Sequence, residues 1–422
     1  MAARARLLAG DRLPRRRQPR LHLHTHALPA PRRAQDGPRH LAPPGARAPR
    51  ERPRRPATAR QPRRPRLRDD PAARRPAGGG RVKALLENVR PWRHDLGGCL
   101  HGCLATLLEH RGVPALPVLG AAWTFRHFPG GVRREEYYYP CADGESLLTA
   151  LAPHHPVRSV WHEPADAATG WEQVRDAVAA GTPVAVAVDN YHLPFRPAYR
   201  DVHSNHLVVV HGYDEERGTV RVLDAVPPAF HGDITLAELT ASRDSGNELV
   251  HERDMFFTGV HIDNRWLSLE LDAAPGDFPA LDRAEVARVL ALNLAHFAAP
   301  PDGDACTGLA GQQAFLEGTV KRLTAGEDIR DELFVAAGAA LACTAVHADW
   351  LALAGRTLDL PGLVEQARSV ERVAHHWSAV RIMAALTRDG GLTPRRLAGR
   401  VHALLKDHES ALTALDDERA EL

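Results

Sequence analysis

The sequence predicts an α+β domain followed by an all-α helical domain, with a disordered tail in front of both. Residues 82–272 combine one helical pattern with several short β-branched runs, which is the α+β layout. Residues 279–422 are rich in Ala, Leu, Arg and Glu at helical spacing, which predicts an antiparallel bundle. Charge separates the tail from the rest. Residues 1–80 hold 22 arginines and 5 acidic residues, whereas the remainder holds 32 basic and 47 acidic residues.

The tail, residues 1–81, combines a net charge of +17 over residues 1–80 with 14 of the 33 prolines. Few apolar side chains and many like charges predict disorder. One interpretation is an electrostatic arm for nucleic acid or an anionic membrane. The other is translation of GC-rich upstream sequence, with the true start near Val82. The tail lacks interleaved aromatic residues that stack on bases, so we expect no nucleic-acid partner.

The remaining composition limits the protein class. No stretch holds about 18 uninterrupted apolar residues, so we expect no membrane-spanning helix and no membrane partner. The start lacks the apolar core of a secretory signal. Five cysteines without a regular framework indicate a reducing compartment, and hence a cytoplasmic protein. The histidines and cysteines form no CxxC or HExxH pair, so no metal site is expected.

The first predicted helix of the α+β domain runs from Cys99 to Gly112, after Gly97-Gly98. Apolar residues recur at helical spacing at Leu100, Leu104, Leu107 and Leu108. Gly112 suits a helix C-terminus. Cys99 therefore lies in the first turn, where the positive end of the helix favours a thiolate. Cys103, one turn later on a similar face, stays open as an alternative nucleophile.

Further elements follow along the chain. Residues 144–152 predict a short helix, and residues 169–180 predict a longer one that ends at Gly181. β-branched runs predict strands at 184–189, 206–214, 219–224, 256–262 and 266–271. The second and third of these strands form an antiparallel pair around the loop 215–218. Beyond residue 279, Asp282 and Glu285 form a capping box. Later helices are predicted at 308–324, 328–354, 361–388 and 394–418.

Cys99, His206 and Asp224 form a candidate catalytic set. A thiol nucleophile needs an imidazole to take its proton, and the imidazole needs a third group to orient it. His206 begins one predicted strand and Asp224 ends its neighbour, and these ends are adjacent in an antiparallel pair. His203 is an alternative base. Each residue also has a purely structural interpretation: a small core cysteine, a loop or core histidine, and a turn-starting aspartate.

The ordered segments resemble papain-like domains of bacteriocin-processing peptidases and, more closely, the BtrH N-terminal-domain family of the butirosin-biosynthesis acyltransferase. The resemblance rests on the Cys99-to-Gly112 spacing, on residues 188–206, and on the strands 207–214 and 220–224. It covers about 82–272, and the remainder resembles an uncharacterised helical domain that often follows. The resemblance implies a papain-like fold with Cys99 as nucleophile, His206 as base and Asp224 as orienting acid.

The resemblance also bears on the surrounding site. Papain-like sites usually place a Gln before the Cys, but residues 92–95 contain none. The Cys99 amide would then hold the oxyanion, with Arg93 or His94 as second donor. The loop from Asp189 to Tyr199 would line the pocket. In it Asp189 would hold a cationic or hydroxylated acceptor, and the other substrate-binding candidates are Tyr191, Tyr199 and His203. The alternative is an ordered loop that packs on the sheet.

The resemblance implies an acyltransferase of specialised metabolism. It would move an acyl group, of aminoacyl type, from an acyl carrier protein thioester to a small amine-bearing acceptor. The phosphopantetheine arm comes with the donor, and no other cofactor is needed. Two alternatives stay open: a papain-like cysteine hydrolase or peptidase with the same three residues, and a non-catalytic binding protein with the same fold.

Overall fold

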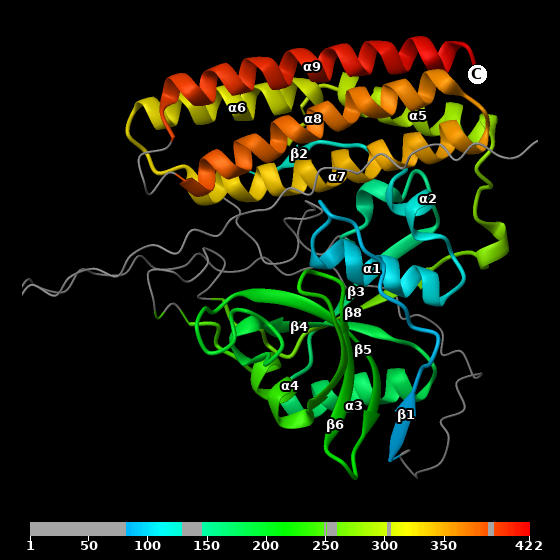
Figure 1. Cartoon of the computed structure of the whole chain (residues 1–422), viewed down its shortest axis with the longest axis vertical. Coiled ribbons are helices and arrows are strands. Elements are labelled where there is room, and N and C mark those ends of the chain that lie inside the picture. Colours follow the sequence, from blue (N-terminus) through cyan, green and yellow to red (C-terminus); the bar gives the residue numbers. More distant parts are fainter. Residues whose placement is uncertain (1–81, 129–145, 249, 251–259, 302–304, 387–391) are drawn as a thin grey trace, which may run out of the picture. The chain divides into compact units, whose positions relative to one another are not determined.

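The computed structural model describes residues 82–128, 146–248, 250, 260–301, 305–386 and 392–422 (Figure 1). The predicted tail at 1–81 lies outside the described residues, as does most of the strand predicted at 256–262. The rest of that strand, residues 260–262, forms no strand. Of the helix predicted at 144–152, the described residues 146–152 contain a 3₁₀ turn at Thr149–Leu151. The Ser146 hydroxyl accepts hydrogen bonds from the amides of Leu148 and Ser159, which competes with a longer helix.

The described part of the α+β domain is built on one antiparallel sheet of seven strands, in the order β3-β8-β4-β5-β6-β7, with β1 also paired to β5. The strands are β1 (Lys83–Leu85), β3 (Val157–His162), β4 (Val184–Asp189), β5 (Asn205–Asp214), β6 (Thr219–Asp224), β7 (Phe230–Thr235) and β8 (Trp266–Leu271). The predicted pairing of β5 with β6 is confirmed. His206 and Asp224 consequently lie at the same end of neighbouring strands.

Helices cover both faces of this sheet (Figure 1). Side chains alternate along each strand, as the pleat requires. Ala187 and Leu207 pack with α1 (Cys99–His110), whereas Val186 and Val208 pack on the other face against α3 (Ala167–Ala179) and α4 (Leu236–Arg243). The α+β prediction is confirmed, and α1 begins at Cys99.

The helical region follows the sheet in sequence. Its helices are α5 (Arg283–Ala298), α6 (Gly308–Thr324), α7 (Arg330–Thr357), α8 (Pro361–Ala385) and α9 (Pro394–Ala420). Asp282 caps α5 by accepting a 2.8 Å hydrogen bond from the Glu285 amide. Thr393 caps α9 in the same way. Among the described helices, α7 has the length and apolar composition that crossing a bilayer would need, but 83% of its most apolar window is buried inside the protein.

One segment of the α+β domain enters the helical region. After α2 (Ala115–Leu119), Ala121, Trp123 and Phe125 join the apolar core of the helices. The next residues form β2 (Arg126–His127), which pairs with β9 (Cys306–Thr307). Trp123 is 1% exposed and stacks on His408 at 4.7 Å and on His347 at 5.4 Å between ring centroids. Asn293 satisfies the backbone beside it, accepting from the Trp123 amide at 3.1 Å and donating to the Ala121 carbonyl at 2.9 Å.

We predict that Gly120→Ala destabilises the protein by about 1–3 kcal/mol, because a methyl group here has no space. Its Cβ would lie 2.6 Å from Cβ of Trp350 and 2.9 Å from the Val346 carbonyl on α7. Urea unfolding measures the effect. Gly318→Ala on α6 is the control, since no neighbouring atom lies within 4 Å, and it should stabilise by about 0.5–1 kcal/mol. Equal behaviour of the two variants would contradict the tight contact of α2 with α7.

We also predict that His408 makes stability sensitive to acid. Burial lowers the pKa of His408 to about 3, from the usual 6.5. Its contribution is therefore present above pH 6.5 and is lost as pH falls towards 3. His408→Phe should reduce proton uptake on unfolding by about one between pH 6 and 4, measured from urea midpoints across pH. The exposed His402→Phe on the same helix should leave the pH dependence unchanged.

Candidate active site

Cys99 is the first residue of α1 and is 8% exposed. Gly98 precedes it in extended conformation and provides no side-chain cap. The first backbone amides of a helix have no acceptor within the helix. The Cys99 sulfur therefore lies beside unsatisfied N–H groups and the positive end of the helix dipole. Both features suit a site where negative charge develops.

His206 and Asp224 meet beside this cysteine. His206 Nε2 lies 2.8 Å from Asp224 Oδ2, and both residues are buried. The same Oδ2 accepts a 3.0 Å hydrogen bond from Nη1 of Arg196, while Asp224 Oδ1 accepts from the Val226 amide at 2.9 Å. The carboxylate is thus held from several sides. Cys99 lies close enough to His206 to help raise the pKa of its imidazole, so the three residues form one electrostatically connected set.

The charges of this set reinforce one another. Burial alone would favour a neutral imidazole, but the Asp224 carboxylate and the Cys99 thiol outweigh burial and raise the pKa of His206 to about 9. Burial also opposes ionisation of Asp224, yet His206, Arg196 and the Val226 amide lower the pKa of this carboxyl below its usual value. At neutral pH the site therefore holds an imidazolium beside a carboxylate.

Cys103 differs from Cys99 in its surroundings. Burial, followed by the nearby Cys99 and Asp224, raises the pKa of the Cys103 thiol well above its usual value. A thiol of this kind stays protonated and is a poor nucleophile. Cys99 is among the groups that raise the pKa of His206, and Cys103 is not. The geometry therefore favours Cys99 over Cys103.

A cavity of about 240 Å³ opens onto Cys99 and His206. From the α+β domain, the cavity is lined by the loop Asp95–Gly98, by Arg196 and by Val226. The helical region lines the cavity too, with Gly338 and Leu341 of α7 and Arg381 of α8. The site is therefore shared by the two regions of the chain.

The two side chains expected to help hold an oxyanion do not line this cavity. Arg93 is exposed and forms a 3.0 Å ion pair with Asp95. His94 Nε2 lies 3.2 Å from Asp349 of α7, and its Nδ1 accepts from the Leu96 amide. Both side chains are used to hold the loop before α1 in place. The Cys99 amide, at the first residue of α1, stays the predicted oxyanion donor.

The loop residues expected to bind substrate form a separate cluster. Asp189 is fully buried, and its Oδ2 lies 2.6 Å from His203 Nδ1 and accepts from the Ser245 hydroxyl at 2.7 Å. Tyr191 stacks on His203 at 4.1 Å between ring centroids. The Tyr199 ring lies under the Arg200 guanidinium. None of the four candidates lines the Cys99 cavity. For Asp189 and His203, an ordered loop that packs on the sheet is therefore a better interpretation than a substrate-binding loop.

Several cavity residues were not singled out from the sequence, among them Arg196, Gly338, Leu341 and Arg381. Arg196 lies within the stretch 188–206 that carries the family resemblance, and it could have been singled out as a cation close to His206. Gly338, Leu341 and Arg381 follow ordinary helical patterns, with no local signal. Their position depends on how α7 and α8 pack against the sheet domain.

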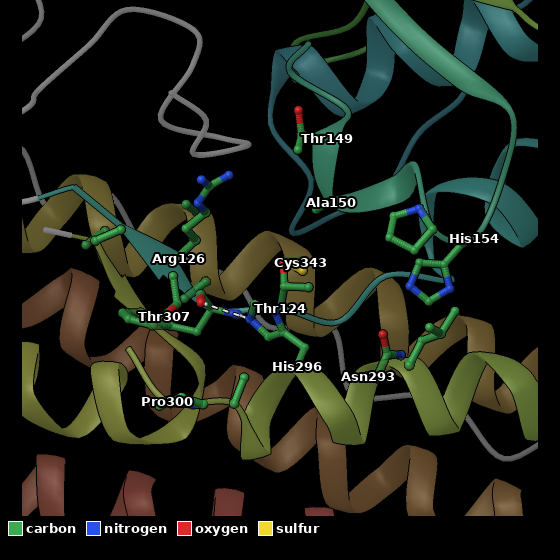
Figure 2. Close-up of a pocket in the computed structure, with 18 residues that line it drawn as sticks. Thr124, Arg126, Thr149, Ala150, His154, Asn293, His296, Pro300, Thr307 and Cys343 are labelled. Atoms are coloured by element: carbon green, nitrogen blue, oxygen red, sulfur yellow. Dashed lines mark hydrogen bonds between the residues drawn. The ribbon is translucent and has the colours of Figure 1, made fainter. Parts of the chain in front are cut away.

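A second cavity, of about 370 Å³, lies elsewhere between the two regions (Figure 2). Figure 2 shows Thr149 and His154 on one side and Cys343 and His296 on the other. Burial lowers the pKa of His154 to about 3 and raises the pKa of Cys343. These groups stay neutral near pH 7, and no nucleophile–base pair is present among the lining residues. This cavity therefore suits apolar contact better than catalysis.

The part of the chain that contains Cys99, His206 and Asp224 matches a known protein family. Residues 98–225 match the family described as butirosin biosynthesis protein H, N-terminal. This segment is therefore similar to the BtrH N-terminal family. The match begins just before Cys99 and ends just after Asp224, so the whole Cys–His–Asp set lies inside it. This similarity supports a biosynthesis-related, acyltransferase-like fold for residues 98–225. A search of curated proteins found no match.

No group of three or more His, Cys, Asp or Glu side chains in the described ranges could hold a metal ion.

We predict that Asp224→Asn lowers the pKa of His206 from about 9 towards 6.5 or below. The substitution removes the carboxylate charge that raises this pKa, whereas burial of the imidazole still lowers it. NMR titration of ¹³C-labelled histidine measures this pKa, and His206→Asn assigns the signal. Asp233→Asn is the matched control, since Asp233 pairs with Arg221 on the exposed part of the sheet. A His206 pKa that is unchanged in Asp224→Asn would contradict the assigned electrostatics.

Proposed function

We propose that the protein is a cysteine acyltransferase that moves an acyl group from a carrier-protein thioester to the amine of a small acceptor. The observation that carries the proposal is Cys99 at the start of α1, linked to a buried His206–Asp224 pair and open to a cavity. His206 would act as acid and base, and Asp224 would orient it. Arg196 would hold Asp224 in place.

The first half-reaction transfers the acyl group to the enzyme. The imidazolium of His206 and the amino end of α1 place positive charge beside the Cys99 sulfur, the condition that favours a thiolate nucleophile. The thiolate attacks the thioester carbonyl carbon, and the Cys99 amide donates to the oxyanion. The intermediate then expels the pantetheine sulfur, which takes the proton from His206. The products are an acyl-Cys99 thioester and a free pantetheine thiol.

The second half-reaction uses the now neutral His206. The Cys99 charge is one cause of its raised pKa, and acylation removes that charge. The imidazole can therefore accept a proton from the acceptor amine as its nitrogen attacks the acyl carbon. Collapse forms the amide and releases the Cys99 thiolate beside the imidazolium. The carboxylate of Asp224 stays ionised throughout, since its pKa is lowered.

The test is intact-protein mass after exposure to a panel of acyl-pantetheine thioesters. We expect an acyl adduct on the wild type and on Cys103→Ala, and none on Cys99→Ala. Cys103→Ala is a matched control because this thiol lies one turn along the same helix. Adducts that persist in Cys99→Ala would contradict the assigned nucleophile.

The same adduct separates a transferase from a papain-like hydrolase. We expect its loss to accelerate at least tenfold with added amines, because base catalysis of about 10²–10⁴-fold acts on the bound amine. Loss at one rate with and without amines would favour hydrolysis. No adduct with any donor, together with a Cys99 that alkylates no faster than Cys306, would favour the binding protein.

A further inference from the structure

The helical region places a cation in the cavity of Cys99. Arg381 comes from α8 and lines this cavity together with Arg196, Cys99 and His206. It lies outside the matched BtrH N-terminal segment, which ends at residue 225. The helical region therefore contributes charge, as well as apolar surface, to the site.

The guanidinium of Arg381 is held in place without an acidic partner. Its Cζ lies 4.5 Å from the centroid of the Phe334 ring. Its Nε is buried and forms no hydrogen bond within the described part of the chain. Gly338 leaves room for it, because a Cβ at that position would lie 3.4 Å from this Nε. No salt bridge to Arg381 occurs among the described residues.

A partly buried guanidinium whose Nε has no hydrogen-bond acceptor among the described residues favours an anion, and a carboxylate or phosphate matches its planar donor geometry. The other charges around the cavity also favour an anion. Arg196 lines the wall and α1 directs its amino end towards Cys99. Asp95 is the acidic residue of the lining, and it is exposed and paired with Arg93. A cationic group is therefore disfavoured next to Arg381.

The size of the cavity indicates which part of the reactants carries the anion. The phosphate of a phosphopantetheine arm is separated from its thioester by two amide units. With the thioester beside Cys99, a cavity of about 240 Å³ would leave little room for that phosphate. The acceptor presents an amine. The acyl group itself is the remaining candidate.

We propose that Arg381 is a specificity residue that binds a carboxylate at the far end of the transferred acyl group. This inference rests on the proposed acyltransferase function. It assigns to the helical region the selection of an anionic acyl chain. Arg381 would bind the chain without taking part in proton transfer, so its effect should depend on donor charge.

The experiment compares two donors of equal shape, glutaryl-pantetheine and its neutral amide, glutaramyl-pantetheine. In the wild type the charged donor should acylate Cys99 at least tenfold faster, as expected for hydrogen bonds to a charged group. Arg381→Met should abolish this preference and leave the rate with the neutral donor unchanged within about twofold. Arg381→Lys should restore part of the preference. Arg372→Met, an exposed arginine on the same helix, is the control.

Equal losses with both donors in Arg381→Met would overturn the proposal, since they would indicate a positioning or oxyanion role. A wild type without preference would overturn it too. A second readout is independent of acyl transfer: binding of free glutarate by calorimetry should weaken at least tenfold in Arg381→Met. If no donor acylates the wild type, the proposed function fails, while this binding still tests Arg381. Binding of inorganic phosphate but not glutarate would overturn the choice of a carboxylate.

Discussion

The structure depends on one packing constraint: the segment after α2 is enclosed by the helical region. Trp123 is surrounded by aromatic rings from α5, α7 and α9, and its Nε1 donates to Thr344 at 3.2 Å. The carbonyl of Gly120 accepts from His347 at 2.7 Å. These contacts are buried and polar, so a shift of the segment would leave several groups unsatisfied. The position of α7 relative to α1, and with it the cavity wall at Gly338 and Leu341, follows from this enclosure.

The electrostatics of the site are built in the same cooperative way. Asp224 is buried, and a buried carboxylate is costly unless it is paired. It is paired here with a histidine, an arginine and a backbone amide. The result is an imidazole that carries a proton at neutral pH and lies beside Cys99. Asp189 is also buried and is paired with His203, but the hydroxyl beside this pair, that of Ser245, donates to the carboxylate of Asp189. The two aspartate–histidine pairs thus differ in what surrounds them.

Much of this could be predicted from the sequence. The predicted bounds are correct for four elements: the strands β4, β6 and β8 and the helix 308–324. In each of them a strong β-branched or helical pattern ends at or near a Gly, Pro or Asp, which marks the boundary. The meeting of His206 and Asp224 followed from antiparallel pairing. The strand β7 was missed since His231, Gly232 and Asp233 have low strand propensity, and it forms by pairing with the edge of β6. Trp123 and Arg381 could not be placed, because a single aromatic or cation carries no period that indicates its tertiary contacts.

The enclosed segment has a consequence for how this chain can be divided. A fragment that ended near residue 272 would contain the whole Cys–His–Asp set, yet it would expose Trp123 and Phe125 to water. The helices without residues 121–127 would likewise lack part of their core and the strand that pairs with β9. More than 150 residues separate Phe125 from the start of α5 at Arg283. Even so, natural or engineered recombination would have to transfer the helices and this segment together. A chimera that joins another BtrH N-terminal domain to these helices would need to carry the segment with it.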